Sequence, residues 1–325
     1  KELTTLRNQL LHFTSLIELE LDFSDHEELE FADRSELCLL ADYIEKVIVR
    51  LVNSFSVGNA IKNGVPVAII GETNAGKSTL LNVLLNEEKA IVSDIHGTTR
   101  DVIEDTVNIG GITFRFIDTA GIRKKGKIYE NIEKYSILRA LSAIDRSNVV
   151  LFLIDGEKGI RDQDKHVAGL AHDAGKGVII VYNKWDTVEK DEKTMSKIEK
   201  EIRAQFLYLN YAPIAFTSAL TGSKVNQLIP LIDQVHDACT LRIPTNVLND
   251  VILDAQMMNP AKPHLGKQLK IYYASQVAVE PPTIVLFVND PELLHFSYAR
   301  YIENKLREAF GFTGTPIKIL ARKRS

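Results

Sequence analysis

The chain has 325 residues, a formal net charge of −4 and a hydrophobic content of 45%. This length predicts two or three domains, and the charge gives no reason to expect a DNA-binding protein. There is no run of about 18 apolar residues, so we expect no membrane-spanning helix. The two cysteines have no metal-like spacing, which predicts reduced thiols in a cytoplasmic protein.

Residues 1–63 are expected to form a helical segment. Apolar residues recur there near helical spacing on both sides of an acidic stretch, residues 24–30, which predicts a hairpin of two amphipathic helices that serves packing alone. Asn63-Gly64 is a helix-stop signal and marks the predicted boundary with the next domain. The chain begins with Lys1 rather than Met, so it is open to interpretation as a fragment of a longer chain.

A phosphate-binding loop is predicted at residues 71–79. The loop carries the pattern G-x-x-x-x-G-K-S, with an apolar strand-like run before it and a helical run after it. Its two glycines let backbone N–H groups surround an anion, the helix start adds a positive dipole end, and Lys77 supplies a charge for the outer phosphates. The residues expected to contact the phosphates are Asn74, Ala75, Gly76, Lys77, Ser78 and Thr79.

Residues 64–241 alternate apolar strand-like runs with helical segments, which predicts a mostly parallel α/β sheet. The strand candidates are residues 65–70, 113–117, 149–154, 177–182 and 214–217. Ligands of such sheets lie beyond the carboxyl ends of the strands. The polar residues that follow these strands are therefore expected to share one site.

Two stretches before residue 122 are expected to complete a magnesium-dependent nucleotide site. Asp118 follows a strand and can hold a Mg²⁺-bound water, while Gly121 can offer its N–H to a terminal phosphate. Thr99 can reach Mg²⁺ only while the γ-phosphate is present, as in a switch loop. The predicted magnesium ligands are Ser78, Thr99 and Asp118, and the first catalytic candidates are Lys77 and Thr99.

Asn183-Lys184-Trp185-Asp186 follows the fourth strand and predicts that the base is guanine. The Asp186 carboxylate can accept hydrogen bonds from the N1–H and the 2-amino group of guanine, whereas adenine would leave it unpaired at a cost of roughly several kcal/mol. Ser218 and Ala219 follow the last strand and are expected to back the base with a backbone N–H. The five signals in this order predict a site for GTP or GDP with Mg²⁺.

These residues resemble the bacterial TrmE/Era/EngA-type GTPases. Residues 1 to about 123 resemble the tRNA-modification GTPase MnmE (TrmE), through the phosphate loop and residues 93–101. Residues from about 118 to 325 resemble the second GTPase domain and the KH-like domain of the ribosome-assembly GTPase Der (EngA), through residues 124–135, 183–186 and 211–214. We therefore expect a hybrid, engineered or produced by a fused or misassembled gene. The folate-binding domain and terminal cysteine motif of MnmE and the second phosphate loop of Der have no counterpart in the sequence.

The resemblance to MnmE implies two further features of the site. A K⁺ ion is expected to activate hydrolysis, and the implied potassium ligands are Asn74, Ser93, Ile95 and Thr98. Glu130 is implied to position the attacking water, because Ile122 stands where many GTPases carry glutamine. The alternative for Glu130 is a solvated carboxylate at the start of a helix.

Residues 242–325 predict a small α+β domain. The expected order is a helix over 246–258, strands over 269–276 and 283–288, a helix from Asp290-Pro291 to Gly311, and a strand over 317–320. This α-β-β-α-β order resembles the KH-like domain that closes Der. Residues 311–314 match the RNA-clamping G-x-x-G by letter, but they lie between a helix and a strand and are not interpreted as that loop. We expect this domain to dock on the GTPase domain and report its nucleotide state, and its basic tail permits RNA contact.

The sequence as a whole predicts an α/β P-loop GTPase domain (residues 64–241) with a mostly parallel sheet, preceded by a helical hairpin (1–63) and followed by a KH-like domain (242–325). The favoured function is a Mg²⁺-dependent GTPase switch in assembly of the large ribosomal subunit, with the subunit or its rRNA as partner. One alternative is a tRNA-modification GTPase with a modification partner. Another is a nucleotide-binding scaffold with negligible turnover.

Overall fold

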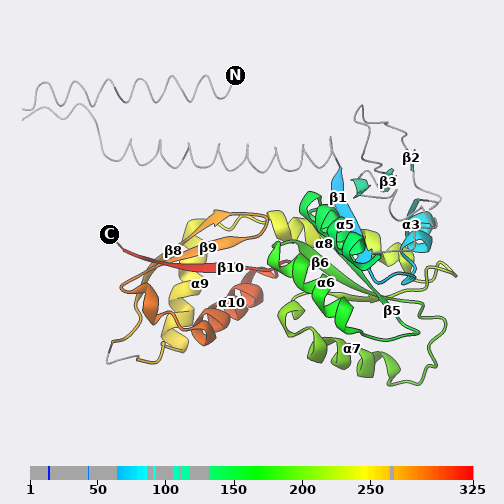
Figure 1. The fold of residues 1–325 in the computed structure, drawn as a ribbon. Coiled ribbons are helices and arrows are strands. Elements are labelled where there is room, and N and C mark those ends of the chain that lie inside the picture. Colours follow the sequence, from blue (N-terminus) through cyan, green and yellow to red (C-terminus); the bar gives the residue numbers. More distant parts are fainter. Residues whose placement is uncertain are drawn as a thin grey trace, which may run out of the picture. The chain divides into compact units, whose positions relative to one another are not determined.

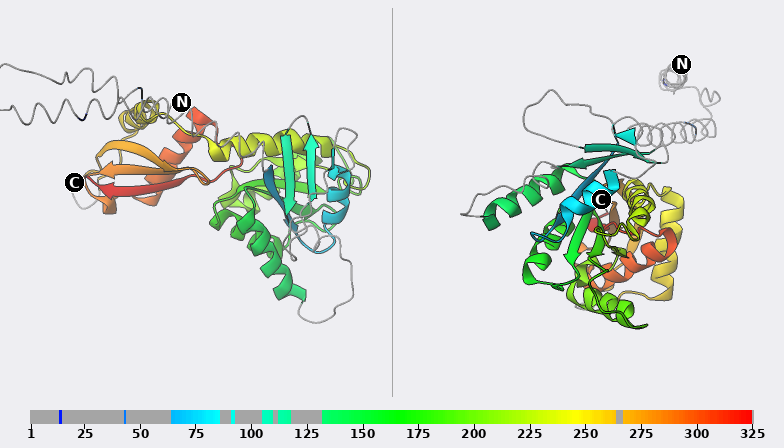
Figure 2. Two further views of the ribbon diagram at one scale, coloured as in Figure 1. Left: turned by 90° about the horizontal axis from the view of Figure 1, so that it is seen from above. Right: turned by 90° about the vertical axis from the view of Figure 1, so that its right-hand side faces the viewer.

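The computed structural model describes Thr14, Tyr43 and residues 64–85, 91–92, 105–109, 112–117, 132–263 and 267–324. From residue 64 onward these residues belong to one compact unit, Asn63–Ser325, whose described elements are coloured in Figures 1 and 2. The predicted hairpin lies outside the described residues, apart from two single positions, and stays a prediction. None of the described helices is long and apolar enough to cross a bilayer.

A seven-stranded sheet forms the centre of the first part of this unit. Its strands are β1 (Val65–Gly71), β2 (Ile91–Val92), β3 (Asp105–Ile109), β4 (Ile112–Ile117), β5 (Val149–Asp155), β6 (Gly177–Asn183) and β7 (Ile214–Phe216). The spatial order is β2-β3-β4-β1-β5-β6-β7. Strands β4, β1, β5, β6 and β7 are parallel, while β2 and β3 pair in antiparallel fashion. The prediction of a mostly parallel α/β sheet is confirmed, and the antiparallel strands β2 and β3 are additions to it.

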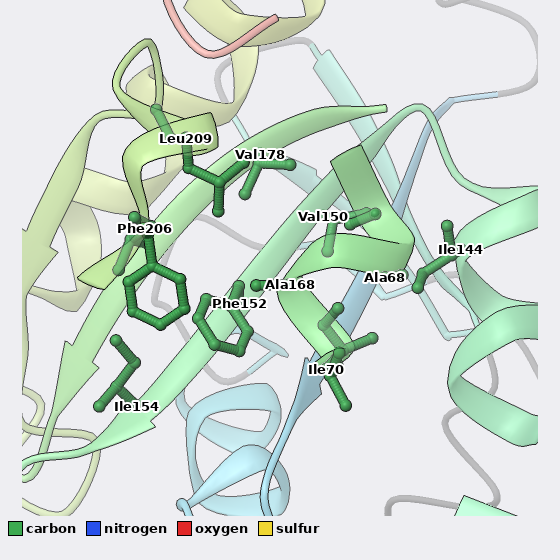
Figure 3. Close-up of a cluster of buried hydrophobic side chains, with 14 of the residues drawn as sticks. Ala68, Ile70, Ile144, Val150, Phe152, Ile154, Ala168, Val178, Phe206 and Leu209 are labelled. Atoms are coloured by element: carbon green, nitrogen blue, oxygen red, sulfur yellow. The ribbon is translucent and has the colours of Figure 1, made fainter. Parts of the chain in front are cut away.

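Helices cover both faces of this sheet. They are α3 (Lys77–Leu85), α5 (Ile132–Arg146), α6 (Asp162–Asp173), α7 (Thr194–Gln205) and α8 (Leu228–Thr240). Residues of α5, α6 and α7 share one core cluster with alternate residues of β1, β5 and β6. Figure 3 shows part of this cluster, where the rings of Phe152 and Phe206 meet edge to face at 5.6 Å between centroids. Every residue of β5 and β6 is buried, because helices lie on both faces, and this explains their unbroken apolar runs.

A smaller three-stranded sheet with two helices forms the second part. Its elements are α9 (Thr245–Met258), β8 (Ile271–Ala278), β9 (Thr283–Val288), α10 (Phe296–Phe310) and β10 (Lys318–Lys323), in the sheet order β10-β9-β8. The two helices pack together against the sheet (Figure 1) and share with it a separate hydrophobic core. The predicted α-β-β-α-β order is confirmed.

The predicted start of the second helix of this part is wrong. Pro291 begins a short 3₁₀ turn, Pro291–Leu293, which the Asp290 side chain caps by accepting from the Glu292 N–H at 3.2 Å. The α-helix begins only at Phe296, after His295, whose ring nitrogen accepts from the N–H of Ser297. Asp290 therefore caps the 3₁₀ turn and His295 caps the α-helix, and the predicted helix start corresponds to the first of these two caps.

The two parts meet at the amino-terminal end of β6. The Val178 N–H donates to the Gly314 carbonyl at 2.7 Å, and the Gly314 N–H donates to the Tyr211 carbonyl at 2.9 Å. The Arg307 guanidinium lies 4.8 Å from the centre of the Tyr211 ring. Gly314 has a φ of +77°, and a Cβ there would overlap the Val235 side chain. The second glycine of the G-x-x-G letters thus serves a joint within the protein, in agreement with the interpretation that these letters are not an RNA clamp.

Candidate nucleotide-binding site

The predicted phosphate loop lies between the end of β1 and the start of α3. Asn74 and Gly76 have φ values of 71° and 95°, in the left-handed region that turns the chain sharply. A Cβ on Gly71 would overlap the Leu153 carbonyl of β5. No acidic residue lies in the first turn of α3, so no carboxylate of that turn competes with an anion for the positive end of the helix.

Lys77 is held inside this loop by the loop's own carbonyl groups. Its ammonium nitrogen donates to the Gly71 oxygen at 2.6 Å and to the Glu72 oxygen at 2.7 Å. Burial lowers the pKa of Lys77 to about 8, although the carboxylates of Glu72 and Asp164 oppose this shift. An ammonium group has three donors, so one N–H remains for a phosphate oxygen, and an anion there would favour the charged form.

An ion pair fastens the outer side of the loop to the start of α6. The Arg161 guanidinium donates to the Glu72 carboxylate at 2.9 Å. Asp164 is 2% exposed and accepts from the Arg161 N–H at 2.9 Å, and burial raises the pKa of its carboxyl group. The sequence analysis missed all three residues, because Glu72 occupies a variable position of the motif and the other two belong to no motif.

Asn183 joins three loops at the carboxyl end of the sheet. Its amide nitrogen donates to the Ala75 carbonyl of the phosphate loop at 2.8 Å, and its amide oxygen accepts from the Ala219 N–H at 2.9 Å. The side chain is 1% exposed. A Cβ on Gly76 would overlap this amide. The predicted guanine-reading loop and the predicted phosphate loop are therefore in direct contact.

The structure gives the loop after β7 a supporting arrangement. The Ser218 hydroxyl donates to one oxygen of the exposed Asp186 carboxylate. The Ser218 N–H donates to the Ser223 carbonyl at 3.1 Å, and the Ala219 N–H donates to Asn183. Both N–H groups thus have partners within the protein, and the expected contact of a backbone N–H of this loop with the base stays a prediction. In this arrangement Ser218 and Ala219 orient the side chains of Asp186 and Asn183.

Asp155, at the end of β5, is a site residue that the sequence analysis did not identify. Its carboxylate is almost completely buried and accepts from the Lys184 ammonium at 2.6 Å. That hydrogen bond is the largest cause that raises the pKa of Lys184 above its usual value. An acidic residue directly after an apolar run is the signal that drew attention to Asp118, and it would also have identified Asp155.

The remaining predicted residues divide between described and undescribed positions. Ser78 and Thr79 lie in the first turn of α3, and the Ser78 hydroxyl is an oxygen donor of the type that Mg²⁺ takes. The others lie outside the described residues and stay predictions; they are Ser93, Ile95, Thr98, Thr99, Asp118, Gly121 and Glu130. Among the described residues, no group of three or more His, Cys, Asp or Glu side chains could hold a metal ion.

Comparison with known protein families identifies both parts of the chain. Residues 66–184 match a family described as 50S ribosome-binding GTPase, and residues 242–322 match the KH-domain-like family of EngA bacterial GTPase enzymes, C-terminal. A GTPase Der from Bacillus cereus (strain ATCC 10987 / NRS 248) is 60% identical over 257 residues, which cover 79% of this chain and 59% of that protein. A GTPase Der from Oceanobacillus iheyensis is 55% identical over 285 residues, or 88% and 65%.

The chain spans less than two thirds of the length of these two relatives. Among solved structures, Era in complex with MgGDPNP and a segment of 16S ribosomal RNA is 23% identical, with a TM-score of 0.41, and the match covers 79% of this chain and 91% of that one. The two family matches, the sheet order and the loop geometry agree. From residue 64 onward the chain has the fold of a P-loop GTPase domain, followed by a domain that matches the KH-like domain of the EngA enzymes.

Proposed function

We propose that this chain binds GTP and GDP with Mg²⁺, hydrolyses GTP, and acts as a switch in assembly of the large ribosomal subunit. The observation that carries the proposal is the Asn183 amide, which ties the phosphate loop to the loop after β7. The loop that carries Asp186, whose carboxylate accepts from the Ser218 hydroxyl, therefore contacts the phosphate loop that carries Lys77, and this contact supports the proposal. This combination favours a guanine nucleotide over an adenine nucleotide.

The chain's own residues divide the work of binding. Backbone N–H groups of the phosphate loop and the start of α3 surround the phosphates, and Lys77 neutralises charge on the outer ones. Mg²⁺, when bound, stabilises the negative charge that develops during phosphoryl transfer. Ser78 would hold this ion together with the predicted ligands Thr99 and Asp118. Turnover at saturating GTP, measured as phosphate release, separates a GTPase from a nucleotide-binding scaffold.

The base assignment has a direct test in the Asp186→Asn variant. Wild-type protein should bind a fluorescent GDP analogue and reject the adenine analogue. In the variant an amide NH2 group replaces one carboxylate oxygen and faces the guanine 2-amino group, so GDP binding should weaken strongly. Xanthosine diphosphate carries a carbonyl at that position and should gain affinity. Equal affinity of wild-type protein for GDP and ADP would contradict the proposal.

The large ribosomal subunit or its rRNA is the proposed partner. The match of residues 66–184 to the 50S ribosome-binding GTPase family and the similarity to proteins named GTPase Der support this proposal. Co-sedimentation with large subunits should depend on whether GTP or GDP is bound. Pull-down of a tRNA-modification protein without ribosomal subunits would favour the alternative, which the MnmE-like residues of the phosphate loop support.

We also propose that the KH-like domain, residues 242–325, reports the nucleotide state of the GTPase domain, residues 64–241. Support comes from α6. Arg161, just before its start, pairs with Glu72 of the phosphate loop, and His172 in its last turn bonds the Tyr211 hydroxyl at 2.9 Å, next to the joint with the KH-like domain. Hydrogen exchange at the joint, compared between GDP and a non-hydrolysable GTP analogue, tests this proposal; equal exchange would refute it.

Three narrower proposals concern the front of the GTPase domain. K⁺ activation through Asn74 and the loop of Ser93, Ile95 and Thr98 predicts faster turnover in KCl than in NaCl. A water-positioning role of Glu130 predicts a loss of turnover in Glu130→Ala.

A hybrid origin is supported by the MnmE-like motifs, whereas the 55% match to GTPase Der covers 88% of the chain and so includes residues on both sides of residue 118. Intact mass and peptides spanning residues 116–129 decide whether the joined chain is made.

A further inference from the structure

The sequence motifs do not explain why a buried carboxylate, that of Asp155, contacts the guanine-reading loop. Asp155 is the last residue of β5, is 2% exposed, and pairs in register with Asn183 at the end of β6. One carboxylate oxygen accepts from the Glu157 N–H at 3.1 Å. The other accepts from the Lys184 ammonium at 2.6 Å. The buried carboxylate thus reaches across two strand ends to the guanine-reading loop.

Lys184 is constrained at both its backbone and its side chain. Its φ of 58° lies in the left-handed region, which is uncommon for lysine, and its carbonyl accepts from the Thr187 N–H at 3.1 Å. The ammonium group also approaches Glu157, at 3.5 Å, but that carboxylate is 64% exposed. The short contact to the buried Asp155 therefore determines where the lysine side chain lies.

The turn after β5 does not need the Asp155–Lys184 contact to keep its shape. The Gly156 N–H donates to the Asn183 carbonyl at 2.9 Å, and the Gly159 N–H donates to the Asp155 carbonyl at 2.9 Å. These backbone bonds, with the Glu157 N–H, define the turn. The ion pair is also a poor source of net stability, because the Asp155 carboxylate loses its water on burial and Lys184 stays 26% exposed. The contact to Lys184 is thus available for a role in binding.

We propose that Asp155 is a positioning residue for the guanine pocket. Lys184 lies in sequence between Asn183, which anchors the pocket to the phosphate loop, and Asp186, which reads the base. Asp155 fixes the lysine side chain before the nucleotide arrives, so that its alkyl stem forms a preformed wall against the face of the base. This inference rests on the proposed function, because it deepens the assignment of the same site.

Preorganisation of one long side chain sets the size of the expected effect. A free lysine must lose rotamer freedom when the base binds, and each immobilised side chain of this kind weakens binding by up to about tenfold. A wall that touches the face of the base does not read its edge. Loss of the wall should therefore weaken GDP and inosine diphosphate, which lacks the 2-amino group, by the same factor.

The test compares Asp155→Asn, Lys184→Met and the double variant, with Glu157→Gln as the matched control. Affinities for fluorescent GDP and inosine diphosphate are measured by titration of the full chain. We expect Asp155→Asn to weaken both ligands equally, by about threefold to tenfold, and Glu157→Gln to leave both unchanged. In the Lys184→Met background, Asp155→Asn should have no further effect, because the residue acts through the lysine.

Two results would overturn the inference. One is wild-type affinity in Asp155→Asn. The other is a loss in the double variant equal to the product of the two single losses, since Asp155 would then act by another route. If Asp155→Asn does not unfold cooperatively, Asp155→Ser replaces it with the same criteria. Wild-type protein that binds no guanine nucleotide would defeat the proposed function and this inference together, whereas normal wild-type binding with an unaffected variant defeats the inference alone.

Discussion

The Asn183→Ala variant tests whether one buried amide holds the nucleotide site together. The substitution removes the donor to the Ala75 carbonyl at 2.8 Å and the acceptor of the Ala219 N–H at 2.9 Å. It also removes a weaker contact from the Thr217 hydroxyl at 3.4 Å. Ala75 is fully buried and Ala219 is 3% exposed, so water can replace the lost partners only poorly.

The magnitude follows from these two orphaned backbone groups. A buried donor or acceptor left without a partner costs about 1–3 kcal/mol. The long contact from Thr217 adds little, because hydrogen bonds weaken at this distance. We therefore expect the free energy of unfolding to fall by about 2–6 kcal/mol in the absence of nucleotide. Nucleotide binding should weaken as well, because Asn183 connects the phosphate loop to the guanine-reading loop.

Urea unfolding without nucleotide measures the first effect, and titration with fluorescent GDP measures the second. The matched control is Asn210→Ala, the same chemical change at an exposed asparagine, which should alter stability by less than about 0.5 kcal/mol. If the urea midpoint of Asn183→Ala matches that of Asn210→Ala, the amide does not connect the three loops and the reasoning fails.

Three further predictions concern charge, backbone and the joint between the domains. Burial holds the pKa of Lys77 at about 8 in the free protein, and a bound phosphate raises it. GDP affinity should therefore be constant below about pH 7 and weaken about tenfold between pH 7 and pH 9; a flat profile in buffers of fixed ionic strength would contradict this. Gly76→Ala should abolish GDP binding, because the added Cβ overlaps the buried amide of Asn183. The control is Gly159→Ala, at a similar φ but with no atom within 4 Å of the added Cβ. It should retain GDP binding, and its lower melting temperature should report the backbone strain alone. Arg307→Ala should lower the free energy of unfolding of the KH-like domain by about 2–4 kcal/mol, because the guanidinium donates to two carbonyl groups of the loop before β10 and to a carboxylate. The control Lys305→Ala removes only an exposed ion pair on the same helix and should change the free energy of unfolding in urea by less than about 1 kcal/mol. Equal losses in the two variants would refute the assignment.

Strands β5 and β6 were predictable from their unbroken apolar runs, whereas strand β3 was not predicted. Strands β5 and β6 have helices on both faces, so every position before the polar last residue is apolar, aromatic or small, and the run is visible in the sequence. Strand β3 reads Asp-Thr-Val-Asn-Ile, and only Val107 is fully buried. Its position in the sheet depends on antiparallel pairing with β4, which is a tertiary interaction that periodicity does not report.

The candidate site shows the same division. Lys77, Asn183 and Asp186 were predictable because their chemistry requires fixed letters at fixed spacing. Arg161 was not, because its partner Glu72 occupies a position of the loop where the motif allows any residue. The partner of the Ala219 N–H was not predictable either, because a backbone N–H is present in almost every residue type. In the structure this N–H donates to the Asn183 amide oxygen.

The glycines of the phosphate loop have a second function besides surrounding an anion. Gly71 allows the loop to approach the Leu153 carbonyl on the neighbouring strand, and Gly76 leaves room for the Asn183 amide. A side chain at either position would push the loop away from β5 or from the guanine-reading loop, even with no phosphate present. The pattern G-x-x-x-x-G-K-S is thus physically coupled to the Asn-Lys-x-Asp pattern, because one asparagine amide fills the space that the second glycine leaves. The two patterns therefore belong to a single site, which is built from two loops in direct contact.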